Sequence, residues 1–440
     1  NLPTIALANG ESSFYRLNVN GVPGKSFENV PILARDSIFI FVEATIDFTA
    51  VTDRLYIGQI EFDQGPNQQE VELVALVQAA YFLFPERDAN GIKETIVIGE
   101  DQDGEEIEVE GFYLEGSPVW TDEKPYVIYG FAGVSSGNTL TVGKGARIYF
   151  HSNSGLVVEQ GARLKVEGTR GSKVVFQGDR LESFFDDIPG QWSGILLREG
   201  SRDHSISHAI VKNSTVGLLV DAAESTSGNS ALRISDTEIY NTSSYGLFAR
   251  QTEIFGSNLV IGNNGSASLA CTEGGSYRFA HSTFANFWSG GVRILPAVFM
   301  SNVTDSQEVQ QEMEEALQAD FENCIIDGNQ GIEFLLEQEP GSQFEFSFAD
   351  SLLRFEDPGG FFQDDPLYDF TNDNQYRNNI YNGTPDFIDV DLNDFRIVQE
   401  SQARGIGNIL VAREVPFDLL GIDRRDSPDA GAYQHIILEE

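Results

Sequence analysis

The sequence predicts an all-β protein in which a parallel β-helix follows a small β-sandwich. An apolar run that ends in an asparagine recurs with Asn213, Asn241, Asn263 and Asn286, which lie 28, 22 and 23 residues apart. The units between them show no helical spacing, and 43 glycines and 32 phenylalanines against 15 prolines are typical of a turn-rich β protein. The first 80 residues instead show short alternating strands separated by turns, which favours a sandwich.

Residues 1–80 are expected to form this β-sandwich. Period-two alternation predicts strands at 14–19, 37–46, 55–62 and 70–78, with turn residues at 20–24 and 63–67. The stretch resembles the immunoglobulin-like module of ASPM/SPD-2/Hydin-type bacterial repeats. About five strands are visible where such a module has seven, so we expect part of its first sheet to lie upstream of Asn1.

Residues 81–137 are expected to be a connector and an N-terminal cap. The acidic run over residues 100–106 places Asp101, Asp103 and Glu105 at alternate positions, as a calcium loop can do. A full EF-hand loop also needs twelve residues between two helices, which the sequence does not offer, so a solvated hairpin tip is the other interpretation. The aromatic stretch 118–129 is expected to cover the open end of the stacked repeats.

Residues 138–440 are expected to form the β-helix. A repeat of this length cannot bury an apolar face alone and must stack on its neighbours. Asparagine tolerates the left-handed backbone of a sharp turn, and the apolar runs at 217–220, 246–249, 267–270 and 291–294 are expected to be the strands that follow the turns. A further unit, Cys324–Asn329, follows an insertion. A β-propeller is the main alternative, but its blades need about 40 to 50 residues each.

Two insertions interrupt the expected β-helix, at 180–192 and 303–320. The first carries Phe184, Phe185, Asp186, Asp187 and Trp192. The second has apolar residues at helical spacing, which predicts either a short amphipathic helix lying on the rod or a helix that binds a partner.

The two cysteines are expected to be buried, unpaired thiols. Cys271 falls in the run after a turn asparagine and Cys324 in the run before one, so they belong to different faces of a coil.

The net charge of −40 excludes some partners. Nucleic acids and anionic membrane surfaces are bound through clustered Lys and Arg, so neither is expected to bind. The same charge disfavours polyanionic polymers unless cations bridge them. No apolar window of 18 residues occurs, so the sequence predicts no transmembrane segment.

The C-terminal part contains a recognisable closing phrase. Ser401-Gln402-Ala403-Arg404-Gly405, then Gly421 to Arg425, then Asp429-Ala430-Gly431-Ala432-Tyr433 resemble the last coils of bacterial pectate-lyase-like β-helix proteins. With the sandwich, the aromatic cap and the glycine-punctuated coils, the chain resembles the right-handed parallel β-helix lipoproteins of Bacteroidota-type cell envelopes. This resemblance implies export to the outer membrane or cell surface through a lipid anchor upstream of Asn1.

Paired acids are the weak candidates for catalysis. Glycoside hydrolysis needs carboxylates that converge on a groove, about 5 to 10 Å apart. Asp186-Asp187 lies in an aromatic loop, and Asp364-Asp365 superficially resembles the acid pair of polygalacturonases but lacks their histidine turn and Arg-x-Lys phrase. A surface loop is the alternative for both pairs. No zinc, phosphate-loop or nucleophile-elbow pattern occurs.

β-Elimination, as in pectate lyases, would need a basic residue beside an acidic calcium cluster. Arg233, Arg250, Arg278 and Arg293 lie at or near strand positions, so one or two are expected to face a groove. No acidic partners stand at matched coil positions.

The sequence therefore predicts a non-catalytic envelope protein whose rod binds a partner or a glycan, as a binding or accessory subunit of an outer-membrane assembly. The aromatic side chains Phe184, Phe185, Trp192 and Trp288 are binding candidates, with core packing as the alternative for each. A polysaccharide lyase or glycoside hydrolase is the rival enzyme hypothesis, and a structural subunit with a flat apolar patch is the rival assembly hypothesis.

Overall fold

The computed structural model describes residues 3–46, 55–63, 66, 68–100, 104–226, 230–303 and 316–437. The chain divides into two compact units, Asn1–Ala80 and Tyr81–Glu440. Among the described residues, none of the helices has the length and apolar character needed to cross a membrane.

The N-terminal unit consists of two antiparallel sheets that share one core, in which Ile5, Leu17 and Ile60 are buried. The first sheet has the order β4 (Ser26–Phe27), β1 (Ile5–Leu7), β6 (Leu55–Phe62), β7 (Gln69–Leu76), and the second β3 (Val22–Gly24), β2 (Tyr15–Val19), β5 (Ile40–Ala44). The described residues of this unit thus contain seven strands rather than about five. The strands that alternation did not predict, β1, β3 and β4, have only two or three residues each.

The strand order separates this unit from an immunoglobulin domain. Immunoglobulin sheets combine strands A, B, E and D in one sheet and C, F and G in the other. Lettered in chain order, the sheets here are D-A-F-G and C-B-E. The likeness is therefore one of architecture, a small two-sheet sandwich.

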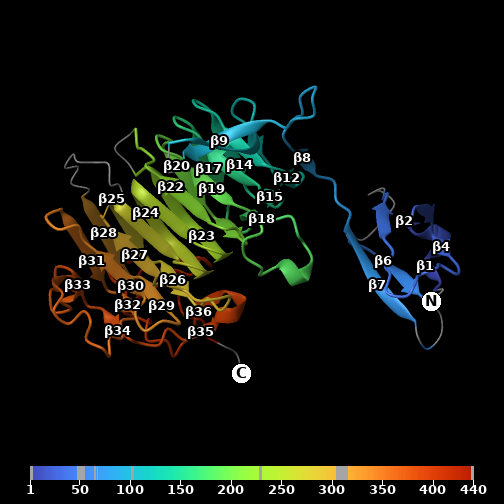
Figure 1. Ribbon diagram of the computed structural model, residues 1–440. Coiled ribbons are helices and arrows are strands. Elements are labelled where there is room, and N and C mark those ends of the chain that lie inside the picture. Colours follow the sequence, from blue (N-terminus) through green and yellow to red (C-terminus); the bar gives the residue numbers. More distant parts are fainter. Residues whose placement is uncertain are drawn as a thin grey trace. The chain divides into compact units, whose positions relative to one another are not determined.

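The second unit is a parallel β-solenoid, as the sequence predicts. Each complete turn gives one strand to each of three sheets, and each strand pairs in parallel with its equivalent in the next turn (Figure 1). Sheet 1 contains β11 (Val119–Trp120), β14 (Thr139–Gly143), β17 (Arg163–Glu167), β20 (His204–Ser207), parts of β23 (Leu232–Thr242), β24 (Leu247–Asn264) and β25 (Leu269–Ala280), β28 (Leu317–Glu322), β31 (Phe344–Ala349) and β33 (Tyr376–Arg377).

Sheet 2 contains β8 (Tyr81–Leu83), β12 (Tyr126–Ile128), β15 (Arg147–Phe150), β18 (Val174–Gly178), β21 (Ala209–Lys212), parts of β23 and β24, β26 (Thr283–Asn286), β29 (Ile325–Gly328), β32 (Leu352–Leu353) and β34 (Ile380–Tyr381). Sheet 3 contains β10 (Glu106–Tyr113), β13 (Phe131–Val134), β16 (Gly155–Val158), β19 (Gly194–Leu197), β22 (Leu218–Asp221), parts of β24 and β25, β27 (Val298–Ser301) and β30 (Phe334–Glu337).

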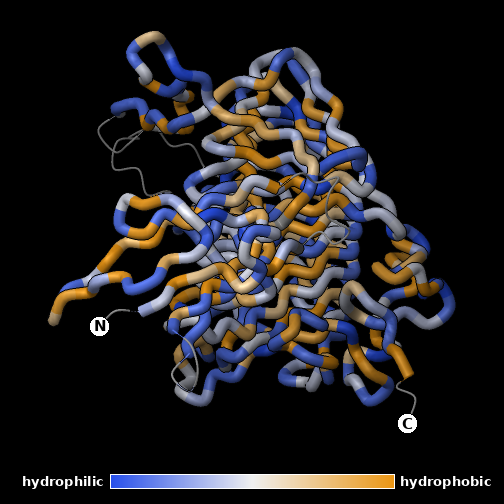
Figure 2. The backbone as a smooth tube through the Cα atoms, turned by 90° about the vertical axis from the view of Figure 1, so that its right-hand side faces the viewer, coloured by the Kyte–Doolittle hydropathy of each residue, from blue (hydrophilic) through white to orange (hydrophobic). Residues whose placement is uncertain are grey.

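Alternate side chains of each strand fill the interior. In sheet 1 the inward positions stack as Val142, Val166, Ile206 and Ile234, and further along as Phe279, Phe321 and Phe348. The rings of Phe321 and Phe348 stack with centroids 4.9 Å apart. Within each turn, apolar and polar stretches accordingly follow one another along the chain (Figure 2). The repeat is thus stabilised by columns of like residues that no single turn could bury.

Left-handed backbone positions recur at the corners, as the turn asparagines predict. Asn213, Asn241 and Asn263 have φ of 65°, 54° and 54° between sheets 2 and 3. The prediction is wrong for Asn286, which does not have a left-handed backbone. It is buried, and its side-chain amide donates to the backbone carbonyl of Asn264 at 2.9 Å.

A second row of left-handed residues, which we call the corner ladder, lies between sheets 1 and 2. Its members occupy one register position in successive turns with φ between 50° and 56°, or 48° for His281. They are His208, Asp236, Asn258, His281, Asn323, Asp350 and Asn378.

The run 291–294 does not form the expected strand. It lies in a loop before β27, and Val292 and Ile294 are exposed while Arg293 between them is buried. The carboxylate of Glu333 accepts two hydrogen bonds from the Arg293 guanidinium, at 2.8 and 2.5 Å. This buried ion pair, rather than strand pairing, fixes the loop.

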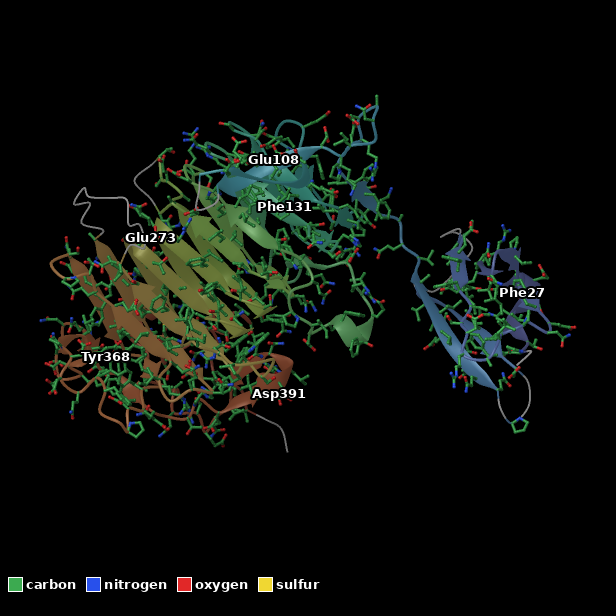
Figure 3. All side chains as sticks on the ribbon, viewed as in Figure 1. Phe27, Glu108, Phe131, Glu273, Tyr368 and Asp391 are labelled. Atoms are coloured by element: carbon green, nitrogen blue, oxygen red, sulfur yellow. The ribbon has the colours of Figure 1, made fainter. Side chains whose placement is uncertain are left out.

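The stacked turns begin before residue 138. Within the expected connector, β8 and β10 to β13 already pair with later turns. β9 (Thr95–Glu100) pairs antiparallel with β10, and this hairpin packs Ile96 on Phe131 and Val157 of sheet 3. Phe131 and Tyr368, labelled in Figure 3, belong to early and late turns of the solenoid.

The turns also end before residue 440. After β34 the chain folds back as the C-terminal segment, residues 386–437, which contains β35 (Phe387–Asp389), β36 (Asp394–Ile397) and α1 (Ile409–Glu414). Its apolar side chains pack on the outer side of sheet 2, Phe395 and Leu419 against Val260 and Ala285. Figure 1 shows β35 and β36 beside β26 and β29.

The closing phrase of the sequence holds this segment in place. Arg424 is buried and donates to the carbonyls of Gly431 and Ala432, and buried Asp429 accepts from the backbone N–H of Gly405 at 2.7 Å. The Tyr433 hydroxyl donates to Glu238 of sheet 2 at 3.0 Å. The phrase is thus a docking device and not an additional coil.

Two smaller predictions can also be placed. Cys271 and Cys324 are buried and unpaired, Cys271 in sheet 3 and Cys324 between the sheet 1 and sheet 2 strands β28 and β29, which confirms the sequence interpretation. Most of the helix expected over 303–320 falls on 304–315, outside the described residues. Residues 317–320 belong to strand β28 instead.

Candidate functional site

The outer side of sheet 1 carries a polar column that contains one aromatic ring. Strand pairing places Arg233 opposite Phe255, and Phe255 opposite Arg278, in three successive turns. Each points outward because its chain neighbours, such as Ile254 and Tyr277, are buried in the interior. Neighbouring strands are about 4.8 Å apart, so the two arginines flank the ring about 10 Å from each other.

A groove of about 610 Å³ opens over this column. Sheet 1 forms its floor, the corner ladder forms one side, and the C-terminal segment adds a wall. Its lining residues are Arg170, His208, Arg233, Ser235, Asp236, Phe255, Ser257, Asn258, Arg278, Glu414, Val415, Pro416 and Phe417.

Arg233 stands out because it has no ionic partner. Its guanidinium lies over the Phe255 ring, 4.8 Å from the centroid, and the side chain is exposed. Within the described part of the chain, neither Arg233 nor the exposed Arg170 forms an ion pair or a hydrogen bond through its guanidinium. Two guanidinium groups without an anionic partner among the described residues of one groove are unusual for a chain that has 68 acidic and 28 basic residues.

Arg278, in contrast, is paired on two sides. Its Nε donates to Glu322 of the next turn at 2.8 Å, and its Nη2 donates to Glu414 of α1 at 2.8 Å. Burial acts to lower the pKa of Arg278, but the hydrogen bond to Glu414 and the charge of Glu322 outweigh it and raise that pKa above its ordinary value.

The carboxylates of the groove are occupied. Asp236 accepts a hydrogen bond from the Asn258 side-chain amide at 2.9 Å, and the Asn258 amide also donates to the carbonyl of Phe417 at 2.9 Å. Glu414 binds Arg278. The corner ladder therefore joins the floor of the groove to its C-terminal wall.

A second hollow, of about 660 Å³, lies at the corner between sheets 3 and 1. It is larger, but its charged side chains are the carboxylates Glu224 and Glu253, and none of its described lining residues is aromatic or basic. We place the candidate site in the arginine groove, because an aromatic floor with convergent polar groups is typical of a ligand site.

The acid pairs named from the sequence lie elsewhere. Asp186 and Asp187 follow a short 3-10 turn in the 180–192 loop, where Asp187 accepts from the Asn241 amide at 2.9 Å. Asp365 caps the 3-10 turn Pro366–Tyr368 through the backbone N–H of Leu367, and Asp364 beside it is exposed. None of the four lines the groove.

The aromatic candidates divide into buried and exposed residues. Trp192 is buried, stacks on Phe150 with centroids 4.2 Å apart and donates to the carbonyl of Lys212, so it cannot contact a ligand. Phe184 is exposed and Phe185 is covered by the Arg180 guanidinium, both in the 180–192 loop. Trp288 is half-buried before the 291–294 run.

The calcium hypothesis concerns residues that the structure describes only in part. Asp101 and Asp103 lie outside the described residues, while Glu105 is exposed between the hairpin strands β9 and β10. In the described ranges, three or more His, Cys, Asp or Glu side chains do not gather in a metal-binding arrangement.

Two of the four arginines expected near a groove, Arg233 and Arg278, face the same one. Arg250 instead pairs with Asp221 at 2.7 Å on sheet 3, and Arg293 is buried with Glu333. The sequence reading missed Phe255, although it lies 22 residues after Arg233 and 23 before Arg278, the same spacings as the turn asparagines. Arg170, Glu414 and Phe417 had no such signal, because they reach the groove from a corner and from the C-terminal segment.

Comparison with known proteins gives no relative: no family model, no curated protein and no solved structure matches this chain.

Proposed function

We propose that this protein is a non-catalytic, glycan-binding protein of the bacterial cell envelope, and that it holds its ligand in the arginine groove of sheet 1. The observation that carries the proposal is the exposed Arg233 guanidinium, stacked on Phe255 and unpaired within the described chain. A planar guanidinium presents donors that match a carboxylate in a bidentate way.

The lining favours a sugar ligand with a carboxylate group. Phe255, flanked by Arg233 and Arg278, and the exposed Phe417 add apolar area to the lining, while Arg233, Arg170 and Ser235 offer donors. Such a mixture of aromatic area and a few placed polar groups suits a ligand that is partly apolar and rich in hydroxyl groups.

The ligand is expected to carry few charges. The whole chain has a net charge of −40, which repels a polyanion such as a polyuronate at long range. A glycan that is neutral apart from isolated carboxylates avoids most of that repulsion and still satisfies one or two arginines.

A binding role is favoured over hydrolysis or β-elimination. General acid catalysis needs a carboxyl group that keeps its proton until the leaving group takes it. In this groove the Glu414 carboxylate is paired with Arg278 and the Asp236 carboxylate accepts a hydrogen bond from the Asn258 amide, so both are already bound by protein partners.

The envelope location rests on the resemblance of the coils and the closing phrase to β-helix lipoproteins. In that setting the protein would serve as a binding or accessory subunit of an outer-membrane assembly. Fractionation of cells followed by native pull-down from membranes tests this part separately, and recovery in the cytosolic fraction alone would contradict it.

Calorimetric titration tests the binding role. The probes are xylotetraose with one glucuronic acid branch and plain xylotetraose, which differ by one charged sugar. We expect the acidic probe to bind more tightly, and Arg233→Ala to weaken it about tenfold or more, because charged hydrogen bonds contribute about 1.5 to 3 kcal/mol. Phe255→Ala should weaken both probes.

Arg404→Ala is the matched control, because Arg404 is exposed and does not line the groove. Equal affinity of the acidic probe for the wild type and Arg233→Ala would refute the site. Release of new reducing ends by the wild type, lost in Glu414→Gln, would replace the binding role with hydrolysis.

A further inference from the structure

We infer that Glu414 is an internal competitor of the ligand: its carboxylate holds Arg278, the second arginine of the groove, which an acidic group of the glycan reaches only when Glu414 is displaced. The inference rests on the proposed glycan site and adds a residue that sets the selectivity and affinity of that site.

Arg278 has one firm and one replaceable partner. Glu322 comes from the adjoining turn of sheet 1, and its side chain is 21% exposed. Glu414 comes from a helix 136 residues further along the chain, and its side chain is 56% exposed. A half-exposed ion pair contributes little to stability, about 0.2 to 1 kcal/mol, so another carboxylate can replace it.

The position of Glu414 in its helix points the same way. It is the last residue of α1, where the partial negative charge of the free carbonyl groups disfavours a carboxylate. The described contacts of Glu414 are with Arg278, and the helix itself offers no stabilising partner. The side chain thus lies where an external anion would be equally well placed.

The two arginines on either side of Phe255 therefore differ in whether a carboxylate is already bound to them. Arg233 is ready to receive a carboxylate, while Arg278 already holds one. A ligand with one acidic group is expected to engage Arg233 directly and must displace Glu414 to reach Arg278. A ligand without an acidic group gains nothing from that displacement.

Glu414→Gln tests the competition, since it keeps the size of the side chain and removes its charge. We expect the acidic xylotetraose to bind about two- to fivefold more tightly to this variant than to the wild type, and the neutral xylotetraose to bind equally to both. Glu400→Gln, an exposed residue of the same C-terminal segment outside the groove, should behave as the wild type.

The outcomes separate the inference from the proposed function. If Arg233→Ala weakens the acidic probe but Glu414→Gln leaves it unchanged, the competition is refuted and the binding site stands. If neither the wild type nor Glu414→Gln binds, both are refuted. If both probes gain equally in Glu414→Gln, the effect is a loosening of the groove wall, and the inference is wrong.

Discussion

Single backbone positions decide how this chain turns. Every described member of the corner ladder has a left-handed backbone, and the occupants are asparagine, aspartate and histidine. Asparagine and aspartate tolerate this conformation better than most residues, and histidine does so less often. The ladder also forms side-chain contacts between turns, such as Asn323 to His281 at 2.9 Å and Asn258 to Asp236 at 2.9 Å. A corner residue must therefore tolerate a left-handed backbone and have a side chain that can contact the next turn.

His281 makes this ladder sensitive to acid. The side chain is buried, and both burial and the nearby Arg424 hold its pKa well below the ordinary value near 6.5. Above pH 6.5 the histidine is neutral in both the folded and unfolded states. Below it the unfolded state takes up a proton that the folded state refuses, so stability is lost as the pH falls.

We expect His281→Asn to flatten this loss between pH 6.5 and 4, by up to about 1.4 kcal/mol per pH unit. Asparagine suits the site because Asn258 and Asn323 occupy it in the adjoining turns. Urea denaturation of both proteins at pH 7.5, 5.5 and 4.5 measures the effect. Buried His204, with a pKa lowered to about 3, lowers the stability of both proteins in acid, so some slope is expected to remain in the variant. An identical slope of stability against pH in the two proteins would show that His281 does not titrate in this way.

At the level of elements, the C-terminal segment makes one side of the repetitive solenoid different from the others. It buries the outward apolar residues of sheet 2 in the later turns and supplies the wall of the groove. Gly431 lies against the solenoid with φ of 92°, and its backbone N–H donates to the carbonyl of Asn323 at 2.8 Å. A methyl group there would lie 2.7 Å from Ile325 Cδ1 and 2.8 Å from Thr283 Oγ1.

Gly431→Ala should therefore detach part of this segment. We expect a loss of about 1 to 2 kcal/mol from the left-handed backbone and an added cost from the clash. Gly405→Ala is the control, because Gly405 has φ of 70° and open space around its Cβ position, so it carries the backbone cost alone. Limited proteolysis followed by mass spectrometry should locate new cleavage within 386–437 in the first variant only, and equal cleavage in both would argue against close packing at Gly431.

The elements also show what a single sequence can and cannot predict. The coils were predictable because identical spacings place Asn241 on Asn263 and Arg233 on Phe255 in successive turns. The run 291–294 looked like another strand, but the buried pair of Arg293 and Glu333 holds it as a loop, and that contact joins residues 40 apart. The positions of the two acid pairs could not be predicted either, because they lie in loops whose packing depends on residues far away in the sequence. The wall of the groove depends on long-range docking that no local pattern encodes.

For the whole molecule, the electrostatic force on an acidic ligand changes sign between long range and contact. The net charge of −40 repels an acidic glycan as it approaches, while Arg233 attracts it once it lies in the groove. Salt screens the first effect more than the second, because exposed charges beyond about 8 to 10 Å are largely screened at physiological ionic strength.

Association of the acidic xylotetraose should thus become faster when the ionic strength rises from about 10 mM to 150 mM, with a Debye length that falls from about 30 Å to 8 Å. Stopped-flow binding measures this rate, and plain xylotetraose serves as the control that should not change. A rate that falls with added salt would mean that the ligand senses a locally positive approach, and the role given to the net charge would be wrong.

The docking of the C-terminal segment on turns far upstream in the sequence has a consequence for biosynthesis. Glu414 meets Arg278 across 136 residues and Tyr433 meets Glu238 across 195, so the C-terminal segment must be translated before the groove acquires its second side. Until then a nascent polypeptide carries the arginines and the ring on an open surface, which the C-terminal segment encloses when it docks.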